Sequence, residues 1–282
     1  MSTVYLNGEF LPAAEARVPV LDRGFIFGDG VYEVVPCYGG KPLRLAEHLE
    51  RLQRSLDAIR IVNPRSDSEW AALVDDIVER NGGGNLSVYV QVTRGVAKRD
   101  HSFPQAVAPT VFMMATPLAT PPEEQVENGV ACITLPDNRW LRCDIKSVSL
   151  LPNVLLRQAA TDAGSAEVVL FRDGLLTEGS ASNILVAREG MLLAPPKDHL
   201  ILAGITYDLV LELDAKHGVP FEVREVSEAE VRSADELMLT SSIREVLAVT
   251  TLDGKPVGNG KPGPIFRMLH KLYQDYKAKL MR

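Results

Sequence analysis

The stretch Thr177-Glu178-Gly179-Ser180-Ala181-Ser182-Asn183 lies between two groups of short strand-like segments, and these neighbours indicate the class of fold. Two such segments, 167–171 and 175–178, lead into it and are joined at Asp173-Gly174, and a hairpin pattern over 183–193 starts at its last residue. Here strand follows strand without a regular alternation with helices. We therefore expect an α+β fold with mixed sheets and helices.

The N-terminal third combines hairpins with helices. Asn7-Gly8 interrupts an apolar run, and this dipeptide accepts the positive φ angles of a tight hairpin turn. Gly39-Gly40 marks a second hairpin. Apolar residues at helical spacing predict a helix over 45–59, and Ser66 with Glu69 three residues later predicts the capped start of another. Strands are expected at 86–93 and 110–115.

The C-terminal part shows the same mixture of elements after a proline-rich break. The prolines of 116–122 remove backbone donors and stiffen the chain, so we predict a small domain over 1–116, a linker over 117–124 and a larger domain over 125–282. Helices are predicted at 154–163, 205–216, from Ser227 and at 265–280. Additional strands are predicted at 129–135, 144–149 and 236–240.

Composition excludes several classes of function. The 282-residue chain has a formal net charge of -7 and no cluster of Lys and Arg that a nucleic acid would require. No apolar run is long enough to cross a bilayer. Three cysteines without a CxxC pattern suggest neither a disulfide framework nor a metal site, so we expect a reduced, cytoplasmic protein without a metal.

Lys146 and Glu178 are the two candidate catalytic groups. A strand lysine usually points to solvent, but a lysine held in a cleft has a lower pKa and its neutral amine can form a Schiff base with an aldehyde cofactor. Glu178 lies either in a polar turn or beside a pyridinium nitrogen, whose proton a carboxylate stabilises. The sequence leaves both alternatives open for each residue.

Candidate anion-binding residues occur in three other places. Gly204-Ile205-Thr206 opens a predicted helix, whose free N–H groups suit a phosphate, unless Thr206 is only an ordinary helix-start residue. Thr240-Ser241-Ser242 offers further donors, and Arg51 offers a fixed charge or a salt bridge at a helix rim. Arg99 and His101 belong either to a basic surface loop or to a carboxylate-binding pair.

Taken in order, these segments resemble the class IV (fold type IV) pyridoxal 5′-phosphate (PLP) aminotransferases, nearly from end to end. No dinucleotide, P-loop or hydrolase motif competes with this resemblance. The motifs that carry the resemblance are Asp22-Arg23-Gly24, Phe27-Gly28-Asp29-Gly30-Val31-Tyr32-Glu33, Glu47-His48-Leu49-Glu50-Arg51-Leu52, Lys146 in its context, Thr177-Glu178-Gly179-Ser180, Ser182-Asn183, Leu202, Gly204-Ile205-Thr206 and Thr240-Ser241-Ser242.

The resemblance implies a role for each candidate. Lys146 would bind PLP and move a proton, and Glu178 would pair with the pyridine nitrogen. Leu202 would pack on the ring, and Tyr32 would line the substrate pocket. The phosphate would be held by Arg51, Gly204, Ile205, Thr206 and Ser242, with Ser241 and Ser182 nearby. The family implies a homodimer with shared active sites.

Within the family, the segment 140–147 and the pair Arg99 and His101 resemble D-amino acid transaminases. There the pair holds the substrate α-carboxylate across the subunit boundary, which implies D-alanine or D-glutamate as donor and 2-oxoglutarate or pyruvate as acceptor. Ile243-Arg244 departs from the smaller or hydroxyl residues expected, so the substrate range remains open. The alternatives are a branched-chain L-amino acid transaminase, a PLP lyase like aminodeoxychorismate lyase, and a non-enzymatic PLP-binding protein.

Overall fold

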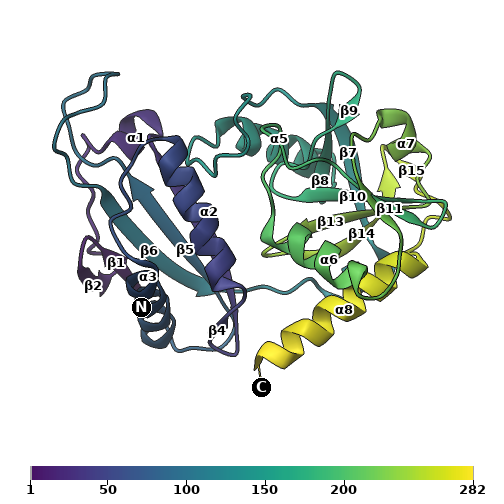
Figure 1. The fold of residues 1–282 in the computed structure, drawn as a ribbon, viewed down its shortest axis with the longest axis horizontal. Helices are drawn as coiled ribbons and strands as arrows, with labels where there is room; N and C mark the ends of the chain where they lie inside the picture. Colours follow the sequence, from purple (N-terminus) through teal and green to yellow (C-terminus); the bar gives the residue numbers. More distant parts are fainter. Residues whose placement is uncertain (1, 282) are drawn as a thin grey trace. The chain divides into compact units, whose positions relative to one another are not determined.

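The computed structural model describes residues 2–281 and divides them into two compact units (Figure 1). Of these residues, unit 1 holds 2–118, 145–150 and 280–281, and unit 2 holds 119–144 and 151–279. Each unit combines helices with its own β-sheet, and one of the sheets is mixed. The predicted α+β class is therefore confirmed.

Unit 1 is built on a six-stranded antiparallel sheet in the order β2-β1-β6-β5-β3-β4. The predicted turn at Asn7-Gly8 is confirmed, since both residues have positive φ angles, 51° and 111°. The strands are β1 (Thr3–Leu6), β2 (Glu9–Pro12), β3 (Gly30–Tyr38), β4 (Lys41–Pro42), β5 (Leu86–Thr93) and β6 (Thr110–Pro117). The helices are α1 (Arg23–Phe27), α2 (Leu45–Ala58) and α3 (Asp67–Arg80).

The core of unit 1 lies between its sheet and the apolar faces of α2 and α3. Alternate residues of β5, including Val90, are buried together with Leu52 of α2 and Trp70 of α3. The capping box that opens α3 is confirmed, because Ser66 N donates to Glu69 Oε2 at 2.7 Å and Glu69 N donates to Ser66 Oγ. A cap of this kind satisfies backbone donors that the first helical turn leaves free.

The segment Ile145–Leu150 differs from its prediction. The sequence pattern predicts a strand of the C-terminal domain over 144–149, whereas the structure has a single antiparallel bridge, Val31 to Ser147, within unit 1. Tyr32 N donates to Lys146 O at 2.9 Å, so the segment is attached to β3. The strand prediction is wrong because the segment forms one bridge and isolated backbone hydrogen bonds to β3 in place of a continuous ladder of strand hydrogen bonds.

Unit 2 contains a nine-stranded mixed sheet, with the order β12-β11-β10-β13-β14-β7-β8-β9 and β15 paired to β14. The pairs β14–β7, β7–β8 and β11–β12 are parallel, and the others are antiparallel. The strands are β7 (Val130–Pro136), β8 (Glu167–Arg172), β9 (Leu175–Leu176), β10 (Asn183–Arg188), β11 (Met191–Ala194), β12 (Phe221–Val223), β13 (Glu236–Ser241), β14 (Glu245–Leu252) and β15 (Lys255–Pro256).

Helices α4 (Glu123–Asn128), α5 (Leu151–Asp162), α6 (Ile205–Ala215), α7 (Glu228–Arg232) and α8 (Pro264–Met281) complete the described elements. Helix α5 begins three residues earlier than predicted, because Pro152 is tolerated in a first helical turn, where its missing N–H has no helical partner to lose. The predicted capping box at Ser227 and Glu230 is confirmed. Within 2–281, no helix combines the length and apolar character needed to span a membrane.

Candidate active site

In unit 1 a buried ion-pair cluster connects β3 to α2. Glu33 is 1% exposed, and its carboxylate accepts from Arg51 Nε at 2.7 Å and from Arg51 Nη2 at 2.9 Å. His48 Nδ1 lies 2.8 Å from Glu33 Oε2. Burial alone would raise the pKa of Glu33, but Arg51 and His48 outweigh it and hold that pKa well below its usual range. Arg51 is therefore a charged side chain with a fixed orientation.

Lys146 lies beside this cluster within unit 1. Its backbone N donates to Ser55 Oγ at 3.2 Å, and its Nζ lies 4.2 Å from the centroid of the Tyr32 ring. Tyr32 is in turn stacked on Tyr89, with ring centroids 5.5 Å apart. Lys146 and Tyr32 are both half-buried, so the amine has a defined position without being sealed inside the core.

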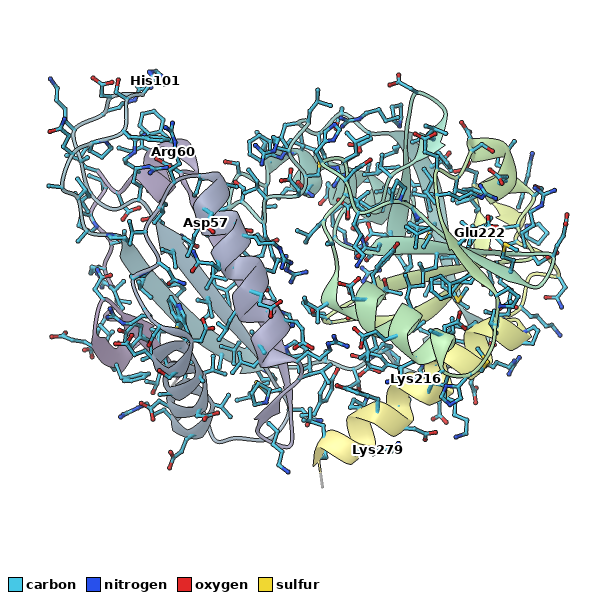
Figure 2. The ribbon with its side chains drawn as sticks, in the orientation of Figure 1. Asp57, Arg60, His101, Lys216, Glu222 and Lys279 are labelled. Carbon is cyan, nitrogen blue, oxygen red and sulfur yellow. The ribbon has the colours of Figure 1, made fainter. Side chains whose placement is uncertain are left out.

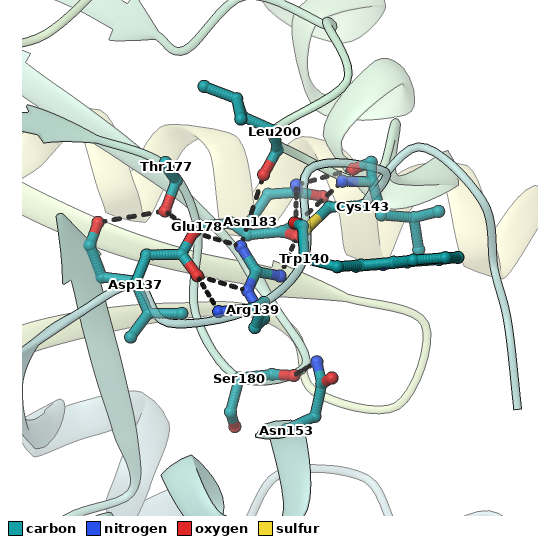
Figure 3. Close-up of polar contacts among 12 residues, drawn as sticks. Asp137, Arg139, Trp140, Cys143, Asn153, Thr177, Glu178, Ser180, Asn183 and Leu200 are labelled. Carbon is teal, nitrogen blue, oxygen red and sulfur yellow. Dashed lines mark hydrogen bonds and ion pairs between the residues drawn. The ribbon is translucent and has the colours of Figure 1, made fainter. Parts of the chain in front are cut away.

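In unit 2 the centre of the polar network is Glu178, which is 5% exposed (Figure 3). Arg139 Nη1 donates to Glu178 Oε1 at 2.5 Å. Glu178 Oε2 accepts from Asn183 Nδ2 and from the backbone N of Leu202, both at 3.1 Å. Burial raises the pKa of Glu178 to about 7, although the Arg139 guanidinium acts in the opposite direction.

Arg139 is itself neutralised on its other side by Asp137, which follows β7. The two side chains form a fork-to-fork pair, with Nε to Oδ1 at 2.9 Å and Nη2 to Oδ2 at 2.8 Å (Figure 3). Thr177 Oγ1 also donates to Asp137 Oδ2, at 2.9 Å, and Arg172 lies 3.2 Å from Oδ1. The fork geometry orients the guanidinium and presents its remaining nitrogen to Glu178.

The hydrogen bonds of Glu178 fit a pyridine ring nitrogen that carries a proton. An ionised carboxylate has about four acceptor positions, of which the described residues fill three. The remaining position is on Oε1 and takes one N–H donor. The positive charge of a pyridinium would also favour the ionised carboxylate, against the effect of burial. The donor set is therefore compatible with the cofactor that the sequence resemblance implies.

The loop between β9 and β10 is organised by a second buried carboxylate, Glu167. Its Oε1 accepts from Ser180 N at 3.1 Å and from the Ser180 hydroxyl, and its Oε2 accepts from Ser182 Oγ at 3.1 Å. Asn153 Nδ2 donates to Ser180 O at 2.8 Å from α5. The Ser182 hydroxyl thus donates its hydrogen to Glu167, which is completely buried.

The N-terminus of α6 provides backbone donors for an anion. Gly204 is the N-cap, and within 2–281 no side chain caps this helix. A Cβ at Gly204 would lie 2.1 Å from Asn183 Oδ1, so this close approach requires glycine. Ile205 and Thr206 open the helix and are buried. Uncapped N–H groups and the positive end of the helix dipole suit a phosphate.

The end of β13 and the turn after it carry hydroxyl groups in the same unit. Thr240 is 1% exposed, and its Oγ1 has no hydrogen-bond partner among residues 2–281. Ser241 Oγ accepts from Arg244 N at 3.0 Å, and Ser242 is half-buried. A buried hydroxyl without a partner is costly, so a bound polar group would satisfy Thr240.

Arg99 and His101 lie on the exposed loop between β5 and β6 in unit 1; Figure 2 labels His101 on this loop. Both side chains contact Phe27 of α1. The Arg99 guanidinium lies 5.3 Å from the ring centroid, and the His101 ring lies 5.4 Å from it. The pair is therefore assembled on one aromatic side chain and open to solvent.

The structure groups the predicted residues within the units. Unit 1 contains Tyr32, Arg51, Lys146, Arg99 and His101, with the last two on their own loop. Unit 2 contains Glu178, Ser182, Leu202, Gly204, Ile205, Thr206, Ser241 and Ser242.

Sequence reasoning assigns no role to Asp137, Arg139, Glu167 or Asn183. A signal was present for three of these. Asp137 and Arg139 are opposite charges directly after an apolar strand, and Glu167 opens an otherwise apolar one.

Known proteins resemble the chain over nearly its whole length. Residues 30–252 match the family model described as amino-transferase class IV. The chain is 41% identical over 272 residues to a protein named D-alanine aminotransferase from Bacillus licheniformis, covering 96% of both chains. It is 38% identical over 276 residues to a D-alanine aminotransferase from Staphylococcus aureus (strain MW2), covering 98% of both.

Solved structures give the same fold. A T.th. branched-chain amino acid aminotransferase with pyridoxamine 5′-phosphate has a TM-score of 0.91 at 26% identity, covering 99% of this chain and 94% of the other. A branched-chain aminotransferase from Thermoproteus uzoniensis with norvaline has a TM-score of 0.88 at 25% identity, covering 99% and 95%. The chain belongs to the class IV amino-transferases, and it is a PLP-dependent aminotransferase.

Proposed function

We propose that this enzyme transfers amino groups between D-amino acids, of the D-alanine and D-glutamate type, and 2-oxo acids such as 2-oxoglutarate and pyruvate. The relatives named D-alanine aminotransferase, matched at 38–41% identity over nearly the whole chain, support this choice of substrate. The observation that carries the chemistry is Glu178, a buried carboxylate with three donors and room for one more.

In this proposal PLP would be held by the residues that the sequence resemblance assigns to it. Lys146 Nζ would bind the aldehyde carbon, Glu178 would pair with the ring nitrogen, and Leu202 would pack on the ring. The phosphate would be held by Arg51, Gly204, Ile205, Thr206 and Ser242, with Ser241 and Ser182 nearby. When bound, PLP supplies an electron sink for the bonds at the substrate Cα.

The protein supplies orientation and proton transfer. Arg99 and His101 bind the substrate α-carboxylate, and Tyr32 lines the pocket beside it. Lys146 Nζ would remove the Cα proton of the donor amino acid as general base and would later return it as general acid. Because the 2-oxo product leaves before the second 2-oxo acid enters, we expect ping-pong kinetics.

The assembly in this proposal is a homodimer with shared active sites, located in the cytoplasm. Large apolar side chains are exposed on each unit, among them Phe25 at 76%, Leu151 at 69% and Leu155 at 60%. A second copy of the chain would cover such side chains, which monomeric proteins seldom expose in groups. Cys37, Cys132 and Cys143 are free and buried, which fits a reducing compartment.

A substrate panel tests the choice of amino acid. Each D- and L-amino acid is assayed with 2-oxoglutarate, and transamination of D-alanine without transamination of L-leucine is the expected result. In Arg99→Ala, the KM for D-alanine should rise while the cofactor absorbance is retained. Activity with L-leucine and none with D-alanine would instead identify a branched-chain enzyme, and pyruvate release without an acceptor would identify a lyase.

Lys146→Ala tests the proton transfer. Turnover should fall by about 10⁴-fold, because this substitution removes both the covalent attachment and the general base. The measurement is kcat at saturating PLP, together with borohydride reduction, which should leave no cofactor attached to the protein. Normal turnover in this variant would refute the role of Lys146.

A further inference from the structure

The Arg99 guanidinium differs from the buried arginines of unit 1 in what holds it. Arg51 is paired with Glu33, and Arg94 with Asp29, each through two hydrogen bonds. No acceptor among residues 2–281 is hydrogen-bonded to the Arg99 guanidinium, whose contact is the Phe27 ring at 5.3 Å. An aromatic ring attracts a cation without occupying its N–H donors, so these stay available for a carboxylate.

Phe27 contacts three cationic or titratable side chains at once. Arg23 lies 4.8 Å from the ring centroid, Arg99 lies 5.3 Å from it, and the His101 ring is 5.4 Å away with an interplanar angle of 44°. Phe27 ends α1, which Asp22 caps by accepting from Gly24 N at 2.8 Å. The ring therefore belongs to a fixed element, while Arg99 and His101 belong to an exposed loop.

The backbone between Arg99 and His101 is tied to the same helix. Arg23 is 3% exposed; its Nη1 donates to Asp100 O at 2.5 Å, and its Nε donates to Asp29 Oδ2 at 2.7 Å. Asp100 Oδ1 accepts from Ser102 N at 2.9 Å, which closes the turn. Helix α1 thus holds the loop at the residue that separates the pair, as well as through the ring.

We propose that Phe27 is a positioning residue that holds Arg99 and His101 in the geometry that binds the substrate carboxylate. This inference rests on the proposed function of the pair. A long arginine side chain on an exposed loop loses rotamer freedom when it binds a ligand, and a side chain already held on a ring loses less. The benefit appears in substrate affinity rather than in the chemical step.

The test is a double-mutant cycle in the holoenzyme, with D-alanine as the varied substrate. Phe27→Leu should raise KM by about twofold to fivefold and leave kcat within about twofold, because a cation–π contact at an exposed site contributes about 0.5–1 kcal/mol. Phe27→Tyr should restore the wild-type KM. In an Arg99→Ala/His101→Ala background, adding Phe27→Leu should leave KM almost unchanged, because the ring acts through these two side chains.

The matched control is Phe10→Leu. Phe10 lies in the same unit, and the Arg80 guanidinium lies 4.3 Å from the centroid of its ring. The variant therefore loses the same kind of cation–π contact, but at a site away from the loop of Arg99. Its KM should equal that of the wild type. Equal effects of Phe27→Leu in both backgrounds, or no effect, would overturn the role of Phe27 alone. An unchanged KM in Arg99→Ala would overturn the carboxylate contact in the proposed function as well.

Discussion

Glu33 in unit 1 and Glu178 in unit 2 are both buried beside an arginine, yet they differ in how many hydrogen-bond donors surround the carboxylate. Glu33 accepts from four donors: two nitrogens of Arg51, His48 Nδ1 and Val34 N. Glu178 accepts from three donors, and Arg139, which is one of them, also pairs with Asp137. The first carboxylate is fully compensated, whereas the second is compensated only in part.

The pKa values follow from this difference. The pKa of Glu33 is held below its usual range, while burial raises that of Glu178 to about 7. A carboxylate whose charge is fixed serves to orient a neighbour, here Arg51. A carboxylate whose charge is only partly compensated would be stabilised by an additional cation, such as the protonated ring nitrogen in the proposed function. Burial beside an arginine thus does not by itself set the charge of a carboxylate, because the number of donors around it also matters.

Glu33→Gln should have the largest effect, and that effect should be on stability. The change leaves the Arg51 charge buried without its carboxylate, which destabilises a protein by about 3–5 kcal/mol. The measurement is urea unfolding of the holoenzyme compared with wild type. Asp275→Asn is the control, since its pair with Lys271 is exposed and should not alter the unfolding midpoint. Equal midpoints for Glu33→Gln and wild type would contradict the compensated role of Glu33.

Glu178→Gln should act on turnover more than on stability. A neutral amide keeps the size of the side chain but no longer stabilises a proton on the ring nitrogen, so kcat should fall by about 10²–10³-fold. Steady-state rates at saturating PLP measure this loss, and the unfolding midpoint measured beside them should change less than in Glu33→Gln. If Glu178→Gln turns over at the wild-type rate, the two carboxylates do not differ in function.

The two carboxylates should also give opposite pH dependences in the cofactor-free protein. The ordinary pKa of a glutamate is 4.5, and that of Glu178 in the folded protein is about 7. Between these two pH values Glu178 is protonated in the folded protein and ionised in the unfolded chain. Stability should therefore fall as pH rises through that window, by up to about 3 kcal/mol. The stabilisation from Glu33, whose folded pKa is lowered, is present above pH 4.5 and is lost as the pH falls below it.

Urea unfolding of cofactor-free wild type and Glu178→Gln at several pH values between 4.5 and 8 measures this window. The slope between pH 4.5 and 7 should be smaller in the variant. Identical slopes would show that another group titrates there.

Much of the fold follows from local sequence patterns. Capping boxes at Ser66 and Ser227, the Asn7-Gly8 turn and the apolar stripe of α2 are local signals, and the structure contains each of these features. The segment around Lys146 is different, because its conformation depends on hydrogen bonds to Tyr32 and Ser55 that are distant in sequence. Periodicity over six residues contains no information about such partners.

The candidate site was predictable only where a motif marks it. Glu178 and Gly204 are identified by resemblance, but the partners that set the state of Glu178 are not. Arg139 is 39 residues away from Glu178 in the sequence, and only the sheet brings them together. Asp137 and Arg139 are only two residues apart and pair locally. That this pair orients Arg139 toward Glu178 becomes visible only when the position of Glu178 is known.

Asn183→Ala should have the smallest effect, and it separates charge from hydrogen bonding at Glu178. Asn183 Nδ2 donates to Glu178 Oε2 at 3.1 Å and to Leu202 O at 2.9 Å, and it is a neutral donor. A net hydrogen bond of this kind is modest, so kcat should fall by about twofold to tenfold. The measurement is kcat at saturating PLP beside Glu178→Gln, with PLP affinity recorded to detect movement of Leu202. A loss as large as that of Glu178→Gln would mean that orientation of the carboxylate, and not its charge, distinguishes it from Glu33.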